Sequence, residues 1–372
     1  MTTTAALESL AQRISKEPLL ACDLEADSLH HYQERVCLIQ LSTPRESVLI
    51  DPLAFSGLAS LAPVLADPLM RKIFHGADYD MRSLHRDFGI EVCNLFDTMV
   101  ACQFLGEKEV GLAAVLKKRF GVELNKKYQK ADWSKRPLAP EMIEYAMEDT
   151  SLLIELYRQL KGELRAKGRL SWVEEECELL SRVRTVSRSD EPFFLRFKGA
   201  AGMEGRSLAI LEELLRFRDE KAGQRDVPAF KIMGNDTIRE LAVKSPCKAA
   251  ELLNIAGLTP KLVERYGQGI LDAVAKGASW PADKLPAFPR FQRSVRDRDQ
   301  EERLKKLKVW REARSRELGI DGGILANNAL LEVLVEMDLK KGGGAEALVP
   351  MKRWQRELFG AELVELLQRI GG

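Results

Sequence analysis

Short apolar runs separated by polar connections open the chain. Leu19 to Cys22, Val36 to Leu41 and Ser47 to Ile50 each have the length of a strand, and few residues connect them. This pattern predicts an antiparallel meander after a short helix-like start. A fourth short strand is expected at Lys72 to Phe74, followed by a helix from Tyr79 to Phe88. The first part of the chain should therefore form a mixed sheet flanked by helices.

Helical spacing dominates from Asp97 onward, with turn-forming glycines between the helices. One helix is expected to start after Pro140, a residue suited to a first helical turn, and to run from Glu141 to about Leu160. The spacing of the apolar residues places one carboxylate on the same face as them. The residues of this stripe are Tyr145, Asp149, Leu153, Leu156 and Leu160. A carboxylate on a buried face must be paired or bound to a metal.

From about Leu208 the pattern is helical throughout, and Pro281, Pro286 and Pro289 separate it from a final helical block near Val295. We interpret this half as two small helical domains. Weak similarity between Pro228-Ala-Phe-Lys-Ile and the segment from Gly323, and between Leu262-Val-Glu-Arg-Tyr-Gly and the segment from Trp354, leaves both duplication and separate origin open.

Composition excludes several classes of protein. A chain of 372 residues with 45% hydrophobic content is expected to form more than one core. It contains neither a signal-peptide pattern nor a run of about 18 uncharged apolar residues, so we expect a soluble, cytoplasmic protein with no membrane partner. Six cysteines without a C-x-x-C pair indicate free thiols. The net charge of +1 means that any nucleic-acid surface must be a local patch.

Four carboxylates are candidates for a metal site. Asp23 and Glu25 stand two apart at a strand end, so their side chains point the same way, and Asp80 and Asp149 lie on helices. Taken one at a time, these acids have ordinary explanations other than metal binding. Asp23 and Glu25 could be a solvated surface pair, and Asp80 could favour the dipole at the start of its helix. Together they could hold two divalent ions about 3.5–4 Å apart. Hard oxygen ligands favour Mg²⁺ or Mn²⁺.

Tyr145 lies one helical turn before Asp149, where its hydroxyl could orient an attacking water; a core tyrosine is the alternative. His75 precedes Gly76 at a strand end and is a candidate contact for a terminal nucleotide, or an ordinary buried histidine. His30 and His31 are a poor metal pair, since adjacent residues of a strand point to opposite faces.

A basic and aromatic segment precedes the helix that carries Tyr145. Residues 125–136 interleave five cations, among them Lys130, with Tyr128 and Trp133. Cations for phosphates and rings for stacking suit single-stranded nucleic acid, although a solvated charged loop is the alternative. The basic run at 303–316 is interrupted by glutamates and indicates a solvated helix face.

These residues resemble the DEDD 3′→5′ exonucleases of the tyrosine subtype, the family of ribonuclease D and the nuclear exosome exonuclease. Asp23 and Glu25 match its D-x-E motif, Tyr79-Asp80 its aromatic-Asp motif, and Tyr145 with Asp149 its Y-x-x-x-D motif. The similarity covers roughly residues 18–160 and includes Val36-Cys-Leu-Ile-Gln40-Leu-Ser, Phe74-His-Gly-Ala-Asp78, Phe96-Asp-Thr98 and Tyr128-Gln-Lys-Ala-Asp-Trp133.

The resemblance implies an α/β ribonuclease-H-like exonuclease domain in which the four acids bind two divalent cations, Mg²⁺ or Mn²⁺, and Tyr145 assists the nucleophilic water. Gln40, His75, Lys130 and Trp133 become candidate substrate contacts. Gly76 departs from the family, since many relatives carry Asn there, which puts contacts to the terminal nucleotide in doubt.

Residues of about 208–282 resemble the HRDC domain, and about 296–370 fit a divergent second copy. The expected organisation is an exonuclease domain at 1–165, a helical connection at 166–207 and two all-α HRDC-like domains at 208–282 and 296–370. Such domains bind or position nucleic acid, so Lys261 and Arg265 are candidate contacts.

The expected function is a metal-dependent 3′→5′ exoribonuclease that trims structured RNA such as tRNA precursors and releases nucleoside 5′-monophosphates. Two alternatives stay open at this point: a 3′→5′ DNA exonuclease, since recognition of the 2′-hydroxyl is not legible in the sequence, and a catalytically inactive RNA-binding scaffold. A monomer is expected, although the oligomeric state does not follow from the sequence.

Overall fold

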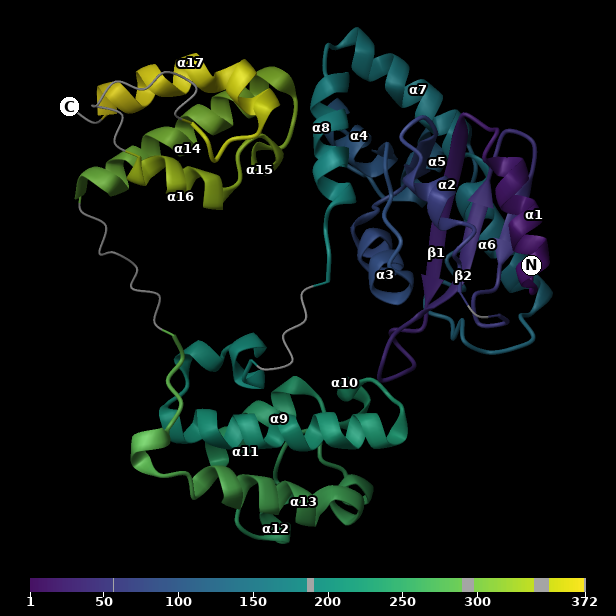
Figure 1. Ribbon diagram of the computed structural model, residues 1–372. Helices are drawn as coiled ribbons and strands as arrows, with labels where there is room; N and C mark the ends of the chain where they lie inside the picture. The colour runs from purple at the N-terminus through teal and green to yellow at the C-terminus, as the bar shows by residue number, and fades with distance from the viewer. Residues whose placement is uncertain (56, 186–190, 290–297, 338–347, 371–372) are drawn as a thin grey trace. The chain divides into compact units, whose positions relative to one another are not determined.

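The computed structural model describes residues 1–55, 57–185, 191–289, 298–337 and 348–370. Contacts divide the chain into two compact units. The first comprises Met1–Ala26, Val36–Thr185 and Val295–Gly372, and the second comprises Asp27–Arg35 and Val186–Ser294. Figure 1 labels the elements of both. Within the described residues, no helix is long and apolar enough to cross a membrane.

A five-stranded mixed sheet organises the first unit, in the order β3-β2-β1-β4-β5. The predicted meander is confirmed: β1 (Leu19–Ala26), β2 (Val36–Ser42) and β3 (Ser47–Ile50) pair antiparallel. β4 (Arg71–Phe74) runs parallel to β1, and β5 (Leu95–Asp97) runs parallel to β4. The sequence pattern did not predict β5, because three residues are too few to display alternation.

Helices cover this sheet on both faces, as Figure 1 shows. α6 contacts β1, β2 and β3, whereas α7 contacts β1 and β4. The prediction of a single helix over 141–160 is wrong. The helix is interrupted at Leu152, which ends α6 and precedes α7. The helices of this unit before Thr185 are α1 (Thr4–Ile14), α2 (Ala62–Ala66), α3 (Asp78–Phe88), α4 (Thr98–Leu105), α5 (Leu112–Phe120), α6 (Pro140–Ser151), α7 (Leu153–Ala166) and α8 (Leu170–Ser181).

The C-terminal helices of the first unit are held to α8 by two glutamates. Glu175 accepts hydrogen bonds from the backbone N–H groups of Arg353 (2.7 Å) and Trp354 (2.9 Å). Glu176 accepts one from the Trp354 indole at 2.8 Å. The Trp354 ring also stacks on Trp172 with centroids 5.3 Å apart. The helices are α14 (Arg298–Leu318), α15 (Gly322–Leu325), α16 (Asn328–Glu336) and α17 (Arg353–Ile370), while the predicted start near Val295 lies outside the described residues.

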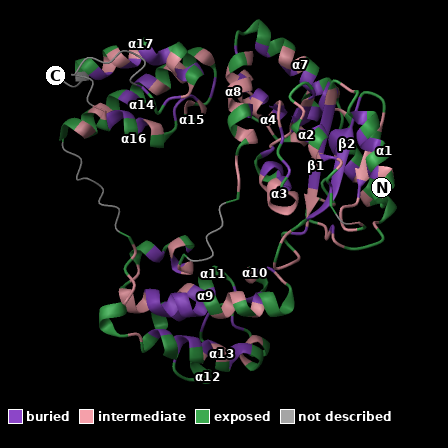
Figure 2. Cartoon of the chain, viewed as in Figure 1, coloured by how far each residue is buried: buried purple, intermediate pink, exposed green. Residues whose placement is uncertain are grey.

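The second unit is helical around α9 (Gly205–Arg225), whose central residues are buried, as Figure 2 shows. Around it lie η1 (Phe193–Arg196), η2 (Ala200–Gly202), α10 (Ala229–Ile232), α11 (Asn235–Lys244), α12 (Ala249–Leu252), α13 (Pro260–Ala278) and η3 (Ala282–Lys284).

The connection from β1 to β2 belongs to this second unit. The Tyr32 hydroxyl donates to Asp219 Oδ2 at 2.7 Å, and His31 Nδ1 lies 2.6 Å from Asp226 Oδ2. His30 and His31 therefore lie in a loop and not in a strand, which corrects the premise of the sequence argument about them.

Candidate active site

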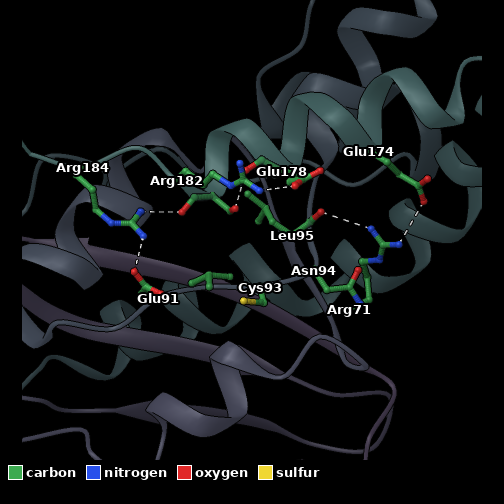
Figure 3. A pocket seen from close by; sticks show the side chains of 11 residues that line it. Arg71, Glu91, Cys93, Asn94, Leu95, Glu174, Glu178, Arg182 and Arg184 are labelled. Carbon is green, nitrogen blue, oxygen red and sulfur yellow. Dashed lines mark hydrogen bonds and ion pairs between the residues drawn. The ribbon is translucent and has the colours of Figure 1, made fainter. Parts of the chain in front are cut away.

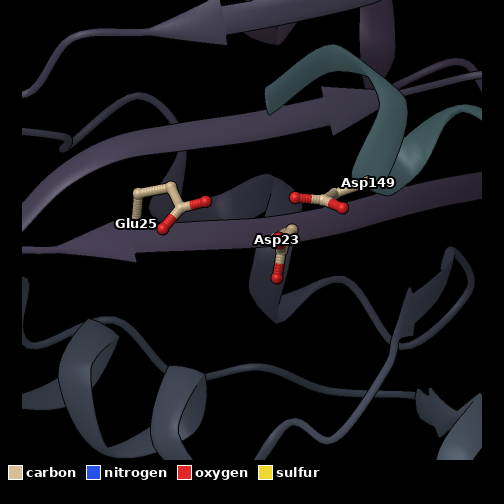
Figure 4. Close-up of side chains that lie close together, drawn as sticks. All are labelled: Asp23, Glu25 and Asp149. Carbon is tan, nitrogen blue, oxygen red and sulfur yellow. The ribbon is translucent and has the colours of Figure 1, made fainter. Parts of the chain in front are cut away.

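Three carboxylates meet between β1 and α6. Asp23 and Glu25 are alternate residues of β1, so both project from the same face of the sheet. α6 crosses this face and contributes Asp149 from its last turn. One oxygen from each of the three carboxylates lies within 4.8 Å of the others, and Figure 4 shows the group. As the apolar stripe predicted, Asp149 is buried, with 9% of its surface exposed.

Burial and mutual repulsion keep these acids from ionising freely. Burial, followed by the charges of Asp149 and Asp80, raises the pKa of Glu25 to about 9. Burial also raises the pKa of Asp149 to about 7 and that of Asp23 well above its ordinary value. Carboxylates at such distances cannot all ionise unless a cation is added. Their hard oxygens fit Mg²⁺ or Mn²⁺, so the residues present suit a divalent ion.

Asp80 stands outside this group of three but acts on it. It lies in the first turn of α3 with 6% of its surface exposed. Its charge contributes to the raised pKa values of Asp23 and Glu25. Burial, and then the charge of Asp97, raises its own pKa to about 7. The sequence predicted four converging acids; the structure gathers three and holds the fourth within electrostatic reach.

Asp97 organises the turn that leads to Asp80, a role to which the sequence argument gave no weight. It is fully buried at the end of β5 and caps α4. Its carboxylate accepts backbone N–H bonds from Gly76 (3.0 Å), Ala77 (2.7 Å), Met99 (2.8 Å) and Val100 (3.2 Å). The available signal was an Asp directly before a helix, the preferred N-cap residue. Asp97 thereby fixes where α3 begins relative to the sheet.

Tyr145 lies one turn before Asp149 on α6 and is partly buried. Its ring is 5.9 Å from that of Tyr128 and 6.0 Å from that of Trp133, centroid to centroid. Burial and the charge of Asp149 raise the pKa of the phenol, so it stays protonated at neutral pH. A neutral hydroxyl beside a carboxylate cluster can donate and accept hydrogen bonds at once.

Trp133 is not available for stacking on a nucleotide, which corrects the sequence expectation. Only 1% of its surface is exposed, and it belongs to a small core with Cys37, Leu38 and Ala146. Arg136 fixes this segment to the sheet, donating to the Cys37 carbonyl oxygen at 2.8 Å and to both carboxylate oxygens of Asp51. The segment at 125–136 therefore packs against the ring of Tyr145 through Tyr128 and Trp133.

Gln40 is the second expected substrate contact that the structure contradicts. Its side chain is fully buried on β2, opposite Asp23, and therefore cannot reach RNA. His75 is partly buried, with Nδ1 at 2.8 Å from Thr98 Oγ1. Lys130 is exposed in the first unit, and Lys261 and Arg265 are exposed on α13 in the second. Substrate contacts by these four residues stay predictions.

A separate cavity of about 690 Å³ lies at the other end of β4, where Arg71 begins the strand. Figure 3 shows that its charges are already matched. Arg71 pairs with Glu174, Arg182 with Glu178 and Arg184 with Glu91. Because each guanidinium is neutralised by a carboxylate, this cavity offers no net charge to a polyanion.

Comparison with known proteins identifies the family. The family model described as 3'-5' exonuclease matches residues 1–165, and the HRDC domain model matches residues 207–274. The ribonuclease D of Gluconacetobacter diazotrophicus is 30% identical, over 98% of this chain and 92% of that protein. The chain belongs to the ribonuclease D family. Its expected activity is thereby confirmed: it is a 3′→5′ exoribonuclease that acts on RNA and contains an HRDC domain.

Solved structures of the ribonuclease D family agree with this assignment. Escherichia coli RNase D, described as an exoribonuclease involved in structured RNA processing, superimposes with a TM-score of 0.74 at 27% identity, over 99% of this chain and 98% of that one. The catalytic core of RRP6 from Trypanosoma brucei is 33% identical with a TM-score of 0.65, over 74% of this chain and 78% of that one. The ribonuclease-H-like mixed sheet expected from the sequence is confirmed.

Proposed function

We propose that this exoribonuclease hydrolyses the 3′-terminal phosphodiester bond with two divalent cations held by Asp23, Glu25, Asp80 and Asp149. The observation that carries the proposal is the meeting of three carboxylates with raised pKa values, of which Asp149 is buried and Asp23 and Glu25 are partly buried. Bound cations supply an activated water and stabilise the departing 3′ oxygen. Asp23, Glu25 and Asp149 would hold one cation, and Asp80 with Asp23 would hold the second.

Tyr145 acts on the water and not on a cation. Its phenol stays protonated because burial and the charge of Asp149 raise its pKa. A protonated phenol next to the carboxylates can accept a hydrogen bond from the water and orient one lone pair toward phosphorus. The contacts of its ring with Tyr128 and Trp133 restrict where the hydroxyl points. Hydrolysis in this geometry releases nucleoside 5′-monophosphates.

The substrate is proposed to be structured RNA with a single-stranded 3′ end, such as a tRNA precursor. Support comes from the E. coli relative, whose description names structured RNA processing. We assign phosphate contacts to Lys130, Lys261 and Arg265, and a terminal-nucleotide contact to His75. A monomeric state and a cytoplasmic location stay predictions.

The C-terminal helices are proposed to form a second HRDC-like domain, within the boundaries 296–370, after the first at 208–282. Element lengths repeat: α9 and α14 have 21 residues, α10 and α15 have 4, α11 and α16 have 10 and 9, and α13 and α17 have 19 and 18. A repeat of four lengths in the same order supports duplication over separate origin.

Side-chain contacts repeat at one fixed offset, which supports the same conclusion. Arg218 donates to the Met233 carbonyl and to Asn235 Oδ1, and Arg311 donates to the Ala326 carbonyl and to Asn328 Oδ1. An edge-to-face ring pair occurs at Phe217–Tyr266 and again at Trp310–Phe359. Every residue of the second set stands 93 positions after its counterpart, as 311 does after 218.

A time course on a 5′-labelled RNA hairpin with a 3′ tail tests the activity and its metal dependence. We expect a ladder that shortens from the 3′ end with Mg²⁺ or Mn²⁺ and stops with EDTA. Asp149→Asn should abolish cleavage while RNA binding persists. Glu144→Gln, an exposed acid on the same helix, is the matched control and should cleave normally. Equal activity in Asp149→Asn would contradict the metal assignment.

A competing DNA strand with the same hairpin and tail separates RNA from DNA as substrate. The ribonuclease assignment predicts that RNA is degraded first when both are present. The 2′-hydroxyl is the group that a protein uses to distinguish them. Faster loss of the DNA strand would favour a DNA exonuclease.

A further inference from the structure

Gln40 is a buried amide with no partner. Its side chain is fully buried, and neither Nε2 nor Oε1 has a hydrogen-bond partner among the described residues. Buried polar groups are nearly always hydrogen-bonded, and an orphaned one costs stability. An apolar residue of similar size, such as Met, would fill the same space without this cost. The orphaned amide therefore calls for a polar partner close to it in the sheet.

The register of the sheet locates that partner. Gln40 on β2 pairs with Asp23 on β1, so the two side chains project from the same face. Directly opposed residues of antiparallel strands have Cβ atoms about 4.5–5.5 Å apart. On its other side Gln40 is opposite Leu49, which has no polar side chain. The polar neighbour in the sheet is therefore the metal-site carboxylate of Asp23.

Other polar side chains between α6 and this face of the sheet form hydrogen bonds that do not include Gln40. α6 contacts β1, β2 and β3. Ser42, two residues beyond Gln40 on the same face, shares hydrogen bonds of 2.7 Å with Thr150 and with Ser47. The Ser42, Ser47 and Thr150 hydroxyls are thus paired with one another, while Asp23 is directly opposite Gln40 in the sheet.

We propose that Gln40 is a positioning residue that donates a hydrogen bond from Nε2 to the Asp23 carboxylate once divalent cations occupy the site. This inference rests on the proposed function and adds a residue to it. A carboxylate has about four acceptor positions, so Asp23 can accept this bond and still present oxygens to a cation. The bond fixes the carboxylate plane, so that its oxygens face the cations. Residues behind metal ligands commonly contribute 10- to 100-fold to metal affinity.

Titration calorimetry with Mn²⁺, without RNA, tests the proposal on the full chain. Gln40→Met should bind Mn²⁺ about 10-fold more weakly than the wild type, whereas its thermal midpoint in EDTA should stay level or rise. Leu38→Met is the matched control, because Leu38 is buried on the same face opposite Glu25. It should bind Mn²⁺ like the wild type. RNA affinity in EDTA should be the same for all three proteins.

A structural role for Gln40 predicts a different pattern. Trp133 Nε1 is a second buried donor without a partner in the described part of the chain, and a hydrogen bond between it and Gln40 would serve folding alone. In that case Gln40→Met would lower the thermal midpoint and leave Mn²⁺ affinity unchanged, which would overturn the proposal. Absence of Mn²⁺ binding by the wild type would instead overturn the proposed metal centre.

A measurement on the wild type covers the case in which Gln40→Met fails to fold. Protein labelled with ¹⁵N in glutamine side chains is titrated with Mg²⁺, and the amide signals are followed by NMR. The Gln40 amide should move downfield and exchange more slowly with solvent as the cation binds. A Gln40 signal that ignores Mg²⁺ at saturation would also overturn the proposal.

Discussion

Asp149→Asn should stabilise the protein in EDTA at neutral pH, even though it removes a ligand of the proposed metal site. Burial raises the pKa of Asp149 from an ordinary 3.8 to about 7, so the native state holds a proton that the unfolded chain has released. Stability falls as pH rises wherever the native state binds more protons. The wild type should therefore lose stability between pH 4 and 7, and Glu25, with a pKa of about 9, extends the loss to pH 9.

The size of the effect follows from the pKa of Asp149. A tenfold change in a protonation equilibrium corresponds to about 1.4 kcal/mol, so the move from 3.8 to about 7 corresponds to about 4 kcal/mol once the group is ionised. The acids share charge, so removing one relieves the others, and the individual contributions do not add. At pH 4 Asp149→Asn and the wild type should be equally stable. At pH 8 the variant should be more stable by a few kcal/mol.

Calorimetric unfolding in EDTA, in steps from pH 4 to 9, measures this difference. Comparison of variant with wild type at each pH cancels the contribution of the second unit. Glu144→Gln serves as the control and should follow the wild type, because Glu144 is exposed. Mg²⁺ at 100 times its dissociation constant should stabilise the wild type by about 2.7 kcal/mol and leave Asp149→Asn unchanged. If the stability of the variant fell with pH as steeply as that of the wild type, Asp149 would not be the group that binds the extra proton in the native state.

Three further outcomes are expected. Asp97→Ala leaves four backbone N–H groups, one buried and three partly buried, without an acceptor. It should lower the free energy of urea unfolding by at least about 3 kcal/mol and should weaken Mn²⁺ binding. A loss of stability below about 1 kcal/mol would contradict its role at the turn before Asp80. Trp133→Ala should lower stability by about 3–5 kcal/mol and reduce kcat with RNA affinity unchanged, because the ring packs beside Tyr145; weaker RNA binding at constant kcat would restore the stacking interpretation. Arg218→Met and Arg311→Met should produce similar drops in thermal stability, and a drop in only one would count against the repeat.

The cluster of carboxylates could be predicted from the sequence because the positions of its members follow from local periodicity. Asp23 and Glu25 alternate on a strand, and Asp149 falls on the apolar stripe of a helix. The face of the strand and the face of the helix that carry these acids could therefore be deduced from the sequence. The helix break at Leu152 could not be predicted, since the apolar stripe continues across it in Leu153 and Leu156. Burial of the stripe sets the pattern on both sides of the break.

Residues that act through tertiary packing were misjudged or missed. Trp133 was expected at the substrate because a ring among lysines suits RNA, and Gln40 was expected there because of the family resemblance. Burial by α6 decides otherwise for Gln40, and a small core that includes Ala146 of that helix decides it for Trp133. Asp97 gains its importance from the Gly76 and Ala77 N–H groups, about twenty residues away, which no local pattern displays.

Anomalous diffraction from crystals soaked in Mn²⁺ tests the two-cation centre most directly. Two peaks are expected about 3.5–4 Å apart, one bounded by Asp23, Glu25 and Asp149 and the other by Asp23 and Asp80. The peak bounded by Asp23, Glu25 and Asp149 should vanish in Asp149→Asn crystals or lose most of its occupancy. A single peak away from these carboxylates, or no peak at saturating Mn²⁺, would contradict the account.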